Sequence, residues 1–240
     1  MKLPADVKVT FVGSDEDVSE LENLKDSPLI GLDAEWRPAM TQFDSQRVGL
    51  FQISDHKNAY LIDMIALSAS KKLDETLSAL FSQVETLFLG FSFHSDMSMF
   101  ERCCPNLHFY KCLGGENNNL VDLQREFKAI IKDEKTAGLA KVVETVFAKP
   151  LCKGEQMSNW ELRPLRKTQQ HYAALDAYCL TQIARKLAAK DEDSYLSQRV
   201  ASADSKTVWV EPPNKEEVEA AEKAAVIENP KEAIIDIFRQ

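Results

Sequence analysis

The stretch "LIGLDAEW" (residues 29–36) ends an apolar run with two carboxylates. The run up to Leu32 predicts a strand that enters a hydrophobic core. Residues i and i+2 of a strand point to the same face, so Asp33 and Glu35 lie side by side. Two like charges held together repel, and one of them tends to protonate unless a positive group is near. The stretch therefore predicts a positive partner at the end of a buried strand: an Arg, a Lys or a divalent cation.

Around this strand, short apolar runs give way to segments of helical period, which is typical of an α/β domain. We expect a lead-in strand and helix before residue 29. We expect further strands at residues 47–54, 59–64, 86–93 and 108–113, the first two forming a hairpin. We expect helices at residues 71–81, 138–148 and 168–190, with Thr168 as the N-cap of the last.

The composition changes near the C-terminus. We expect one α/β domain over residues 1–195 and an extension over residues 196–240. The extension is rich in Glu and Ala and is broken by Pro residues. We expect it to form short helices and to offer a site for a protein partner.

The overall composition fits a folded domain in a reducing compartment. The chain has 240 residues, of which 44% are hydrophobic, and a net charge of −9. No apolar run approaches the roughly 20 residues that cross a bilayer, so we expect no membrane partner. The five cysteines contain no C-x-x-C pair, and with no export signal we expect a cytoplasmic and/or nuclear location. The acidic balance disfavours nonspecific coating of nucleic acid, but it allows phosphodiester chemistry through metal ions.

Further acidic residues follow the predicted strands and enter the predicted helices. Asp96 follows the strand at 86–93, where a metal ligand and a helix cap are both open interpretations. Asp176 lies one turn after Tyr172 in the last helix, and positions i and i+4 share a helix face. Asp122 opens a helix, and an N-cap is favoured there over a ligand. Taken singly, Tyr172 could also be a core aromatic.

The wording of three segments resembles a known enzyme family. "LDAEW", "LGFSFHSDMSMF" and "YAALDAY" look like the three motifs of the DEDD superfamily of 3′–5′ exonucleases, in the family order. The stretch "KGEQMSNWELRPLRKTQQHYAALDAYCL" is similar to RNase D-like and Werner-type domains, with a wording nearest to the Nibbler-type, or mutator, exonucleases. The resemblance covers residues 28–190.

The resemblance implies an RNase H-like (DnaQ-like) fold, with a mixed five-stranded sheet flanked by helices. It assigns the catalytic carboxylates to Asp33, Glu35, Asp96 and Asp176 and the catalytic tyrosine to Tyr172. It implies two Mg²⁺ or Mn²⁺ ions among the four carboxylates, which would answer the need for positive charge beside Asp33 and Glu35.

The implied reaction is metal-dependent hydrolysis of single-stranded nucleic acid from the 3′ end to nucleoside 5′-monophosphates. RNA is favoured as the substrate and DNA stays open. A catalytically silent nucleic-acid-binding or scaffold module of the same fold is the alternative. Loss of a carboxylate is the usual mark of such a module, and here all four are present.

Adjacent residues in the last motif allow two mechanisms. "HYAALD" contains both His171 and Tyr172, and a sister subgroup of the family uses histidine. On a regular helix, residues i and i+4 differ by about 40° in direction, whereas i and i+5 differ by about 140°. Tyr172 is therefore expected to face Asp176, which favours the tyrosine (DEDDy) subgroup.

Substrate contacts are less clearly marked. Basic residues gather at 149–167, just before the last helix, and suggest a phosphate-binding rim as readily as a solvated loop. We take Lys153, Arg163 and Arg166 as candidates there. Trp36 could stack on a terminal base or pack in the core, and Gln52 could contact the substrate backbone or only point outward.

Overall fold

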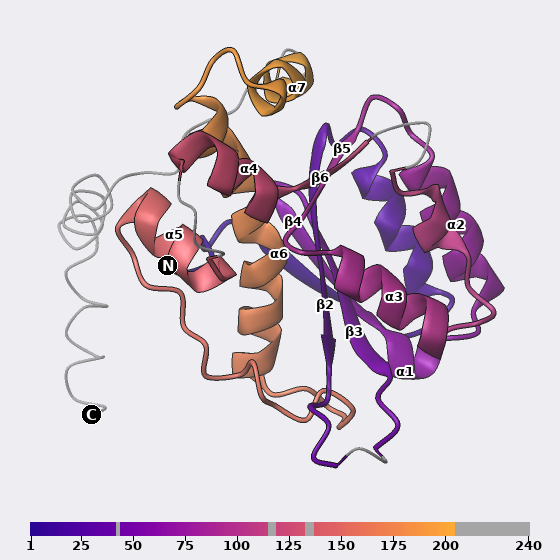
Figure 1. Ribbon diagram of the computed structural model, residues 1–240. Helices are drawn as coiled ribbons and strands as arrows, with labels where there is room; N and C mark the ends of the chain where they lie inside the picture. Colours follow the sequence, from indigo (N-terminus) through magenta and orange to yellow (C-terminus); the bar gives the residue numbers. More distant parts are fainter. Residues whose placement is uncertain (42–43, 115–118, 133–136, 205–240) are drawn as a thin grey trace, which may run out of the picture. The chain divides into compact units, whose positions relative to one another are not determined.

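A mixed sheet of six strands organises the chain (Figure 1). The computed structural model describes residues 1–41, 44–114, 119–132 and 137–204. The strand order is β1-β4-β3-β2-β5-β6, in which β2, β3 and β4 are antiparallel neighbours and the other pairs are parallel. The strands are β1 (Lys8–Val12), β2 (Leu29–Trp36), β3 (Val48–Ser54), β4 (Asn58–Asp63), β5 (Leu87–Gly90) and β6 (Leu120–Asp122).

Helices cover both faces of this sheet (Figure 1). The longest, α6, lies against β2 and β3 and also contacts α4, α5 and α7. The opposite face carries α2, α3 and two 3₁₀ helices, η1 and η2. The bounds are α1 (Met64–Leu67), α2 (Lys71–Phe81), α3 (His94–Cys103), α4 (Leu123–Ile131), α5 (Leu139–Phe147), α6 (Lys167–Ala188), α7 (Tyr195–Asp204), η1 (Asp17–Leu24) and η2 (Phe109–Cys112).

The alternation along β2 divides the core into two layers. Leu29 faces the α6 layer, while Ile30 and Leu32 face the layer that contains α2 and α3. Gly31 belongs to the α6 face, and a Cβ built there would lie 2.0 Å from the carbonyl oxygen of Ala177 in α6. Only glycine permits this approach, so α6 contacts the main chain of β2 directly.

The sheet has six strands where five were predicted, and one predicted strand is wrong. Residues 109–112 form η2, because the carboxylate of Asp74 accepts hydrogen bonds from the backbone N–H groups of His108 and Phe109. Phe109 then packs among the rings of the layer that contains α2 and α3, with its ring centroid 5.6 Å from that of Phe51. The strand that pairs with β5 on the side away from β2 comes later in the sequence, at β6.

The α6 helix was predicted within two residues at each end, but its N-cap was not. Helix α6 begins at Lys167, and Arg166 occupies the N-cap position in place of Thr168. The Gln169 side chain accepts a hydrogen bond from the backbone N–H of Arg166, at 3.1 Å, which satisfies a donor at the helix start. The long buried helix is thereby fixed at the end that carries Tyr172.

The described chain continues past residue 195 without leaving the core. Helix α7 packs on α6, and its residues Leu196 and Val200 are buried in the α6 layer. The described residues up to Asp204 belong to one compact unit. The helices and the partner site predicted beyond residue 204 lie outside the described residues. Within the described part of the chain, no helix is long and apolar enough to cross a bilayer.

Candidate active site

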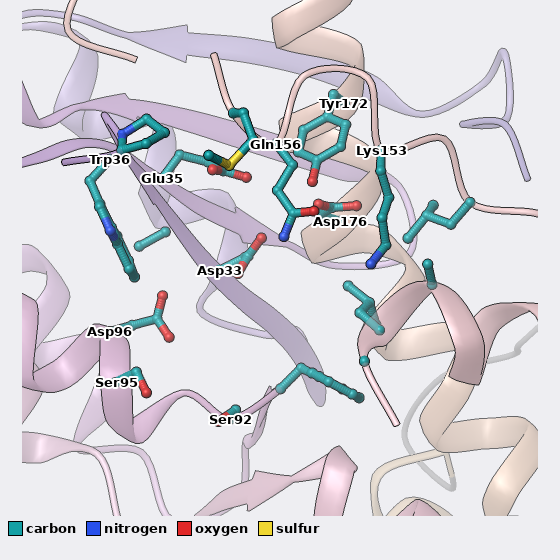
Figure 2. Close-up of a pocket in the computed structure, with 18 residues that line it drawn as sticks. Asp33, Glu35, Trp36, Ser92, Ser95, Asp96, Lys153, Gln156, Tyr172 and Asp176 are labelled. Carbon is teal, nitrogen blue, oxygen red and sulfur yellow. The ribbon is translucent and has the colours of Figure 1, made fainter. Parts of the chain in front are cut away.

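Three carboxylates from two elements meet at the end of β2. Asp33 and Glu35 lie on the β2 face that packs against α6, and Asp176 comes from α6 itself. One carboxylate oxygen from each of the three lies within 4.8 Å of the others. Figure 2 shows the three side chains pointing toward one another. The side-by-side placement predicted for Asp33 and Glu35 is confirmed.

Asp96 faces the same pocket from the other side (Figure 2). It lies in the first turn of α3, six residues past the end of β5, and is buried. It falls outside the group of three, and α3 brings it to the pocket rather than the strand end expected from the sequence. Asp122, by contrast, is the predicted N-cap: its carboxylate accepts from the backbone N–H of Gln124 at 2.9 Å.

Burial makes this cluster electrostatically costly. Burial raises the pKa of Asp33 to about 7, and burial and the charge of Asp33 raise the pKa of Asp96 to about 8. Burial and the three neighbouring carboxylates raise the pKa of Glu35 to about 10. The pKa of Asp176 is also raised by burial and by Asp33, although its hydrogen bond with Tyr172 and the charge of Lys153 oppose this. The site therefore favours protons or bound cations over four free negative charges.

The donor set fits hard divalent cations. Mg²⁺ and Mn²⁺ prefer oxygen ligands, and a few carboxylates with open positions for water and phosphate are typical of such sites. Oδ1 of Asp176 is buried and has no hydrogen-bond partner among the described residues. This oxygen lies beside two more carboxylates and is therefore available to coordinate a cation. Asp33, Glu35, Asp96 and Asp176 could together hold such ions.

We expect the metal-free protein to lose stability as the pH rises. The pKa values of Asp33 and Asp96 in the folded protein lie above the ordinary value of 3.8. The stability that these two groups contribute is therefore full below pH 3.8 and is lost as the pH passes through about 7 and 8. The melting temperature in EDTA should fall by about 5–10 °C from pH 5 to pH 9. Glu35→Gln should flatten this slope, and saturating Mg²⁺ should also flatten it. A wild-type slope equal to that of Glu35→Gln would contradict the electrostatic account.

Tyr172 completes the cluster from α6. Its hydroxyl hydrogen-bonds with Asp176, and burial and then the Asp176 charge raise the pKa of the phenol far above its usual range. The ring is 9% exposed and packs near Trp160. His171 is exposed to solvent. The orientation predicted from helical geometry is therefore confirmed: Tyr172 faces Asp176 and His171 does not.

Two of the five predicted substrate contacts line the pocket. Trp36 stands beside Glu35, and Lys153 reaches toward Asp176 from the segment before α6 (Figure 2). Arg166 lies outside the pocket lining, and its guanidinium donates to Glu155 at 2.5 Å and to Ser158 at 3.1 Å. Its contact with a substrate stays a prediction.

Gln52 and Arg163 require correction as substrate contacts. Gln52 is fully buried in the sheet as the cross-strand neighbour of Asp33, so no ligand in the pocket can reach it as the structure stands. The guanidinium of Arg163 is occupied by Asp63 and by backbone carbonyls. Charge and position along the sequence could not separate these internal roles from a role at the surface.

Sequence reasoning also missed part of the pocket, which has a volume of about 450 Å³. Ser92 lines it from the β5–α3 connection, Ser95 from the first turn of α3, and Gln156 from the segment before α6. Ser92 has φ 55°, and its backbone N–H donates to Asp122 at 3.1 Å. A polar residue with positive φ directly after a strand is uncommon, but the sequence offers no signal for that backbone geometry.

This fold and this acidic pocket define a class of nuclease. A family model for the 3′–5′ exonuclease domain matches residues 10–191, and the chain belongs to this family. The predicted superfamily and the RNase H-like exonuclease fold are thereby confirmed, with six strands in the sheet.

The relatives include exonucleases of the mutator type. The chain is 30% identical to the human exonuclease mut-7 homolog over 210 residues, which are 81% of this chain and 24% of that protein. It is 29% identical to ribonuclease D of Shewanella over 196 residues, 77% of this chain and 46% of that protein. The solved EXO domain of Aedes aegypti Nibbler superposes with a TM-score of 0.69 at 26% identity, covering 83% of this chain and 98% of that domain. The chain thus spans about a quarter of the curated mut-7 homologs and nearly all of the solved exonuclease domain.

Proposed function

We propose that this protein is a metal-dependent exonuclease that removes nucleotides from the 3′ end of single-stranded nucleic acid, with RNA favoured over DNA as the substrate. The observation that carries the proposal is the carboxylate group of Asp33, Glu35 and Asp176, with Asp96 and Tyr172 facing the same pocket. Membership of the 3′–5′ exonuclease family supports the reaction. The name of the related ribonuclease D favours RNA as the substrate.

The four carboxylates would hold two divalent ions, Mg²⁺ or Mn²⁺. When bound, such a pair supplies positive charge to the attacking and leaving oxygens of an in-line displacement at phosphorus. The carboxylates fix where that charge lies. The products would be nucleoside 5′-monophosphates and a chain shortened at its 3′ end.

Tyr172 would orient the attacking water. Its raised pKa keeps the phenol protonated at neutral pH, so it serves as a hydrogen-bonding group and not as a free phenolate base. Lys153 would neutralise charge on the scissile phosphate, because its side chain lines the pocket on the Asp176 side. Trp36, which borders the same pocket, would stack on the terminal base.

We propose a cytoplasmic and/or nuclear location for this protein. All five cysteines are free, which agrees with the proposed cytoplasmic and/or nuclear location but does not select it.

Metal removal tests the reaction. On matched RNA and DNA oligonucleotides labelled at the 5′ end, we expect stepwise shortening from the 3′ end with Mg²⁺ or Mn²⁺ and no shortening in EDTA. Readdition of either ion should restore the rate, and chromatography should identify 5′-monophosphates. An oligonucleotide blocked by a 3′-phosphate is the matched control, and internal cleavage of it would indicate an endonuclease. Full activity in chelator would overturn the metal mechanism, whereas binding without shortening in Mn²⁺ would indicate a silent binding module.

A further inference from the structure

Arg163 is the most completely bonded side chain near the candidate active site. Its Nε and Nη2 donate to the two carboxylate oxygens of Asp63, at 2.8 and 2.6 Å. Nη1 donates to the carbonyl oxygens of Trp160 and Leu162, both at 2.9 Å, and Nη2 also donates to that of Gly49 at 2.7 Å. A guanidinium has five N–H donors, so every one of them has an acceptor.

These bonds join the segment before α6 to the sheet. Asp63 ends β4 and caps α1, where it accepts from the backbone N–H of Ile65 at 2.9 Å. Gly49 lies in β3. The planar fork of an arginine can serve all of these acceptors at once, whereas a lysine offers a single ammonium and cannot reproduce the geometry.

Trp160 is the residue whose place this arrangement fixes. Its side chain is fully buried, and its indole N–H has no hydrogen-bond partner among the described residues. Its own polar group therefore does not hold it. Its carbonyl is held by Arg163 and lies against Gly49, where an added Cβ would come within 2.5 Å of that oxygen.

Trp160 in turn contacts the tyrosine of the site. The ring centroids of Trp160 and Tyr172 are 6.0 Å apart, with an interplanar angle of 38°. Tyr172 is mostly buried, and its hydroxyl reaches Asp176. The indole therefore forms one wall of the space that sets the direction of the phenol.

We infer that Arg163 is a positioning residue that acts through Trp160 to hold the Tyr172 hydroxyl in place beside Asp176. This inference rests on the proposed function, since it concerns the orienting role of Tyr172. Arg163 lies outside the pocket lining, so its effect should fall on the rate of the chemical step and not on substrate binding.

A double-mutant cycle tests the inference. Arg163→Lys alone should lower kcat by about 10²-fold with KM nearly unchanged, because small misplacements of a reacting group cost about that much. In a Tyr172→Phe background the same change should lower kcat little further, since the hydroxyl that Arg163 positions is already absent. Arg47→Lys is the matched control: Arg47 pairs with Glu161 of the same segment at 3.5 Å, its side chain is 57% exposed and lies outside the pocket lining, and kcat should stay near wild type.

Stability is measured beside the kinetics. Melting temperature and circular dichroism report whether Arg163→Lys folds, and the rates are taken below the onset of melting. If that variant does not fold, Trp160→Phe replaces it in the same cycle, because it keeps an aromatic ring and leaves Arg163 bonded to the backbone.

The outcomes separate two failures. If Tyr172→Phe keeps the wild-type rate, the proposed role of Tyr172 is wrong. If Tyr172→Phe is slow but Arg163→Lys loses the same factor in both backgrounds, Arg163 acts independently of the tyrosine and the inference is overturned. A folded Arg163→Lys, or a Trp160→Phe used in its place, with wild-type kcat would overturn it as well.

Discussion

Asp33→Asn is expected to lower kcat by about 10³-fold or more and to leave the fold intact. Asparagine keeps the shape of the side chain but removes its negative charge, so one member of a group held within 4.8 Å can no longer bind a cation as a carboxylate. Asp176→Asn should have an effect of the same size. The measurement is single-turnover release of nucleotides from a 3′ end with saturating Mg²⁺.

The melting temperature of Asp33→Asn shows whether the variant has lost a metal ligand or a core contact. In metal-free buffer at pH 8, Asp33→Asn should melt at or above the wild-type temperature, because burial and repulsion destabilise the ionised cluster. Asp122→Asn is the matched control: it removes another carboxylate near Asp96, but asparagine can still cap α4, so the rate should change little. A wild-type rate for Asp33→Asn would exclude Asp33 as a ligand.

Tyr172→Phe is expected to lower kcat by about 10²–10⁴-fold, the usual range for a group that orients or transfers a proton. Phenylalanine keeps the ring against Trp160 and deletes only the hydroxyl, so the loss reports on the reaction. His171→Ala should cost at most about a few-fold, because His171 is exposed and only its contact with the substrate is at stake.

The pH profile checks the same assignment independently. A histidine base would place an acid limb near its unperturbed pKa of about 6.5, and His171→Ala would abolish that limb. If Tyr172 orients the attacking water, the pH–rate profile of His171→Ala should overlay the wild-type profile. An inactive His171→Ala beside a nearly normal Tyr172→Phe would move the chain to the histidine subgroup and leave the exonuclease proposal standing.

The sequence predicts the parts of the site that rest on regular periodicity. The i, i+2 spacing of Asp33 and Glu35 and the i, i+4 spacing of Tyr172 and Asp176 each fix a common face. Both faces are found as predicted. The meeting of the two faces needed the family resemblance, because no local pattern tells that β2 lies under α6.

The misplaced residues share a physical cause. Arg163 and Gln52 are polar, and polarity alone suggests the surface, but the fold buries Gln52 and pairs the guanidinium of Arg163 with Asp63. The apolar run at 108–113 has strand composition, yet the carboxylate of Asp74 takes the N–H groups that a strand would use. In each case a residue far away in the sequence determines the local structure or the role of the side chain. Local propensity gives no information about such distant residues.

The contact at Gly31 also determines how far the ligand groups can move. Gly31 precedes Asp33 by two residues on one face of β2, and Ala177, whose carbonyl it meets, directly follows Asp176. The separation of the two main-chain segments that carry these carboxylates is thus set by a direct backbone contact, with no side chain between them. If the carboxylates bind cations as proposed, the site would not widen for larger ions as flexible calcium loops do. Selectivity between divalent ions would then depend on Gly31, because its contact with α6 sets the spacing of the segments that carry the carboxylates.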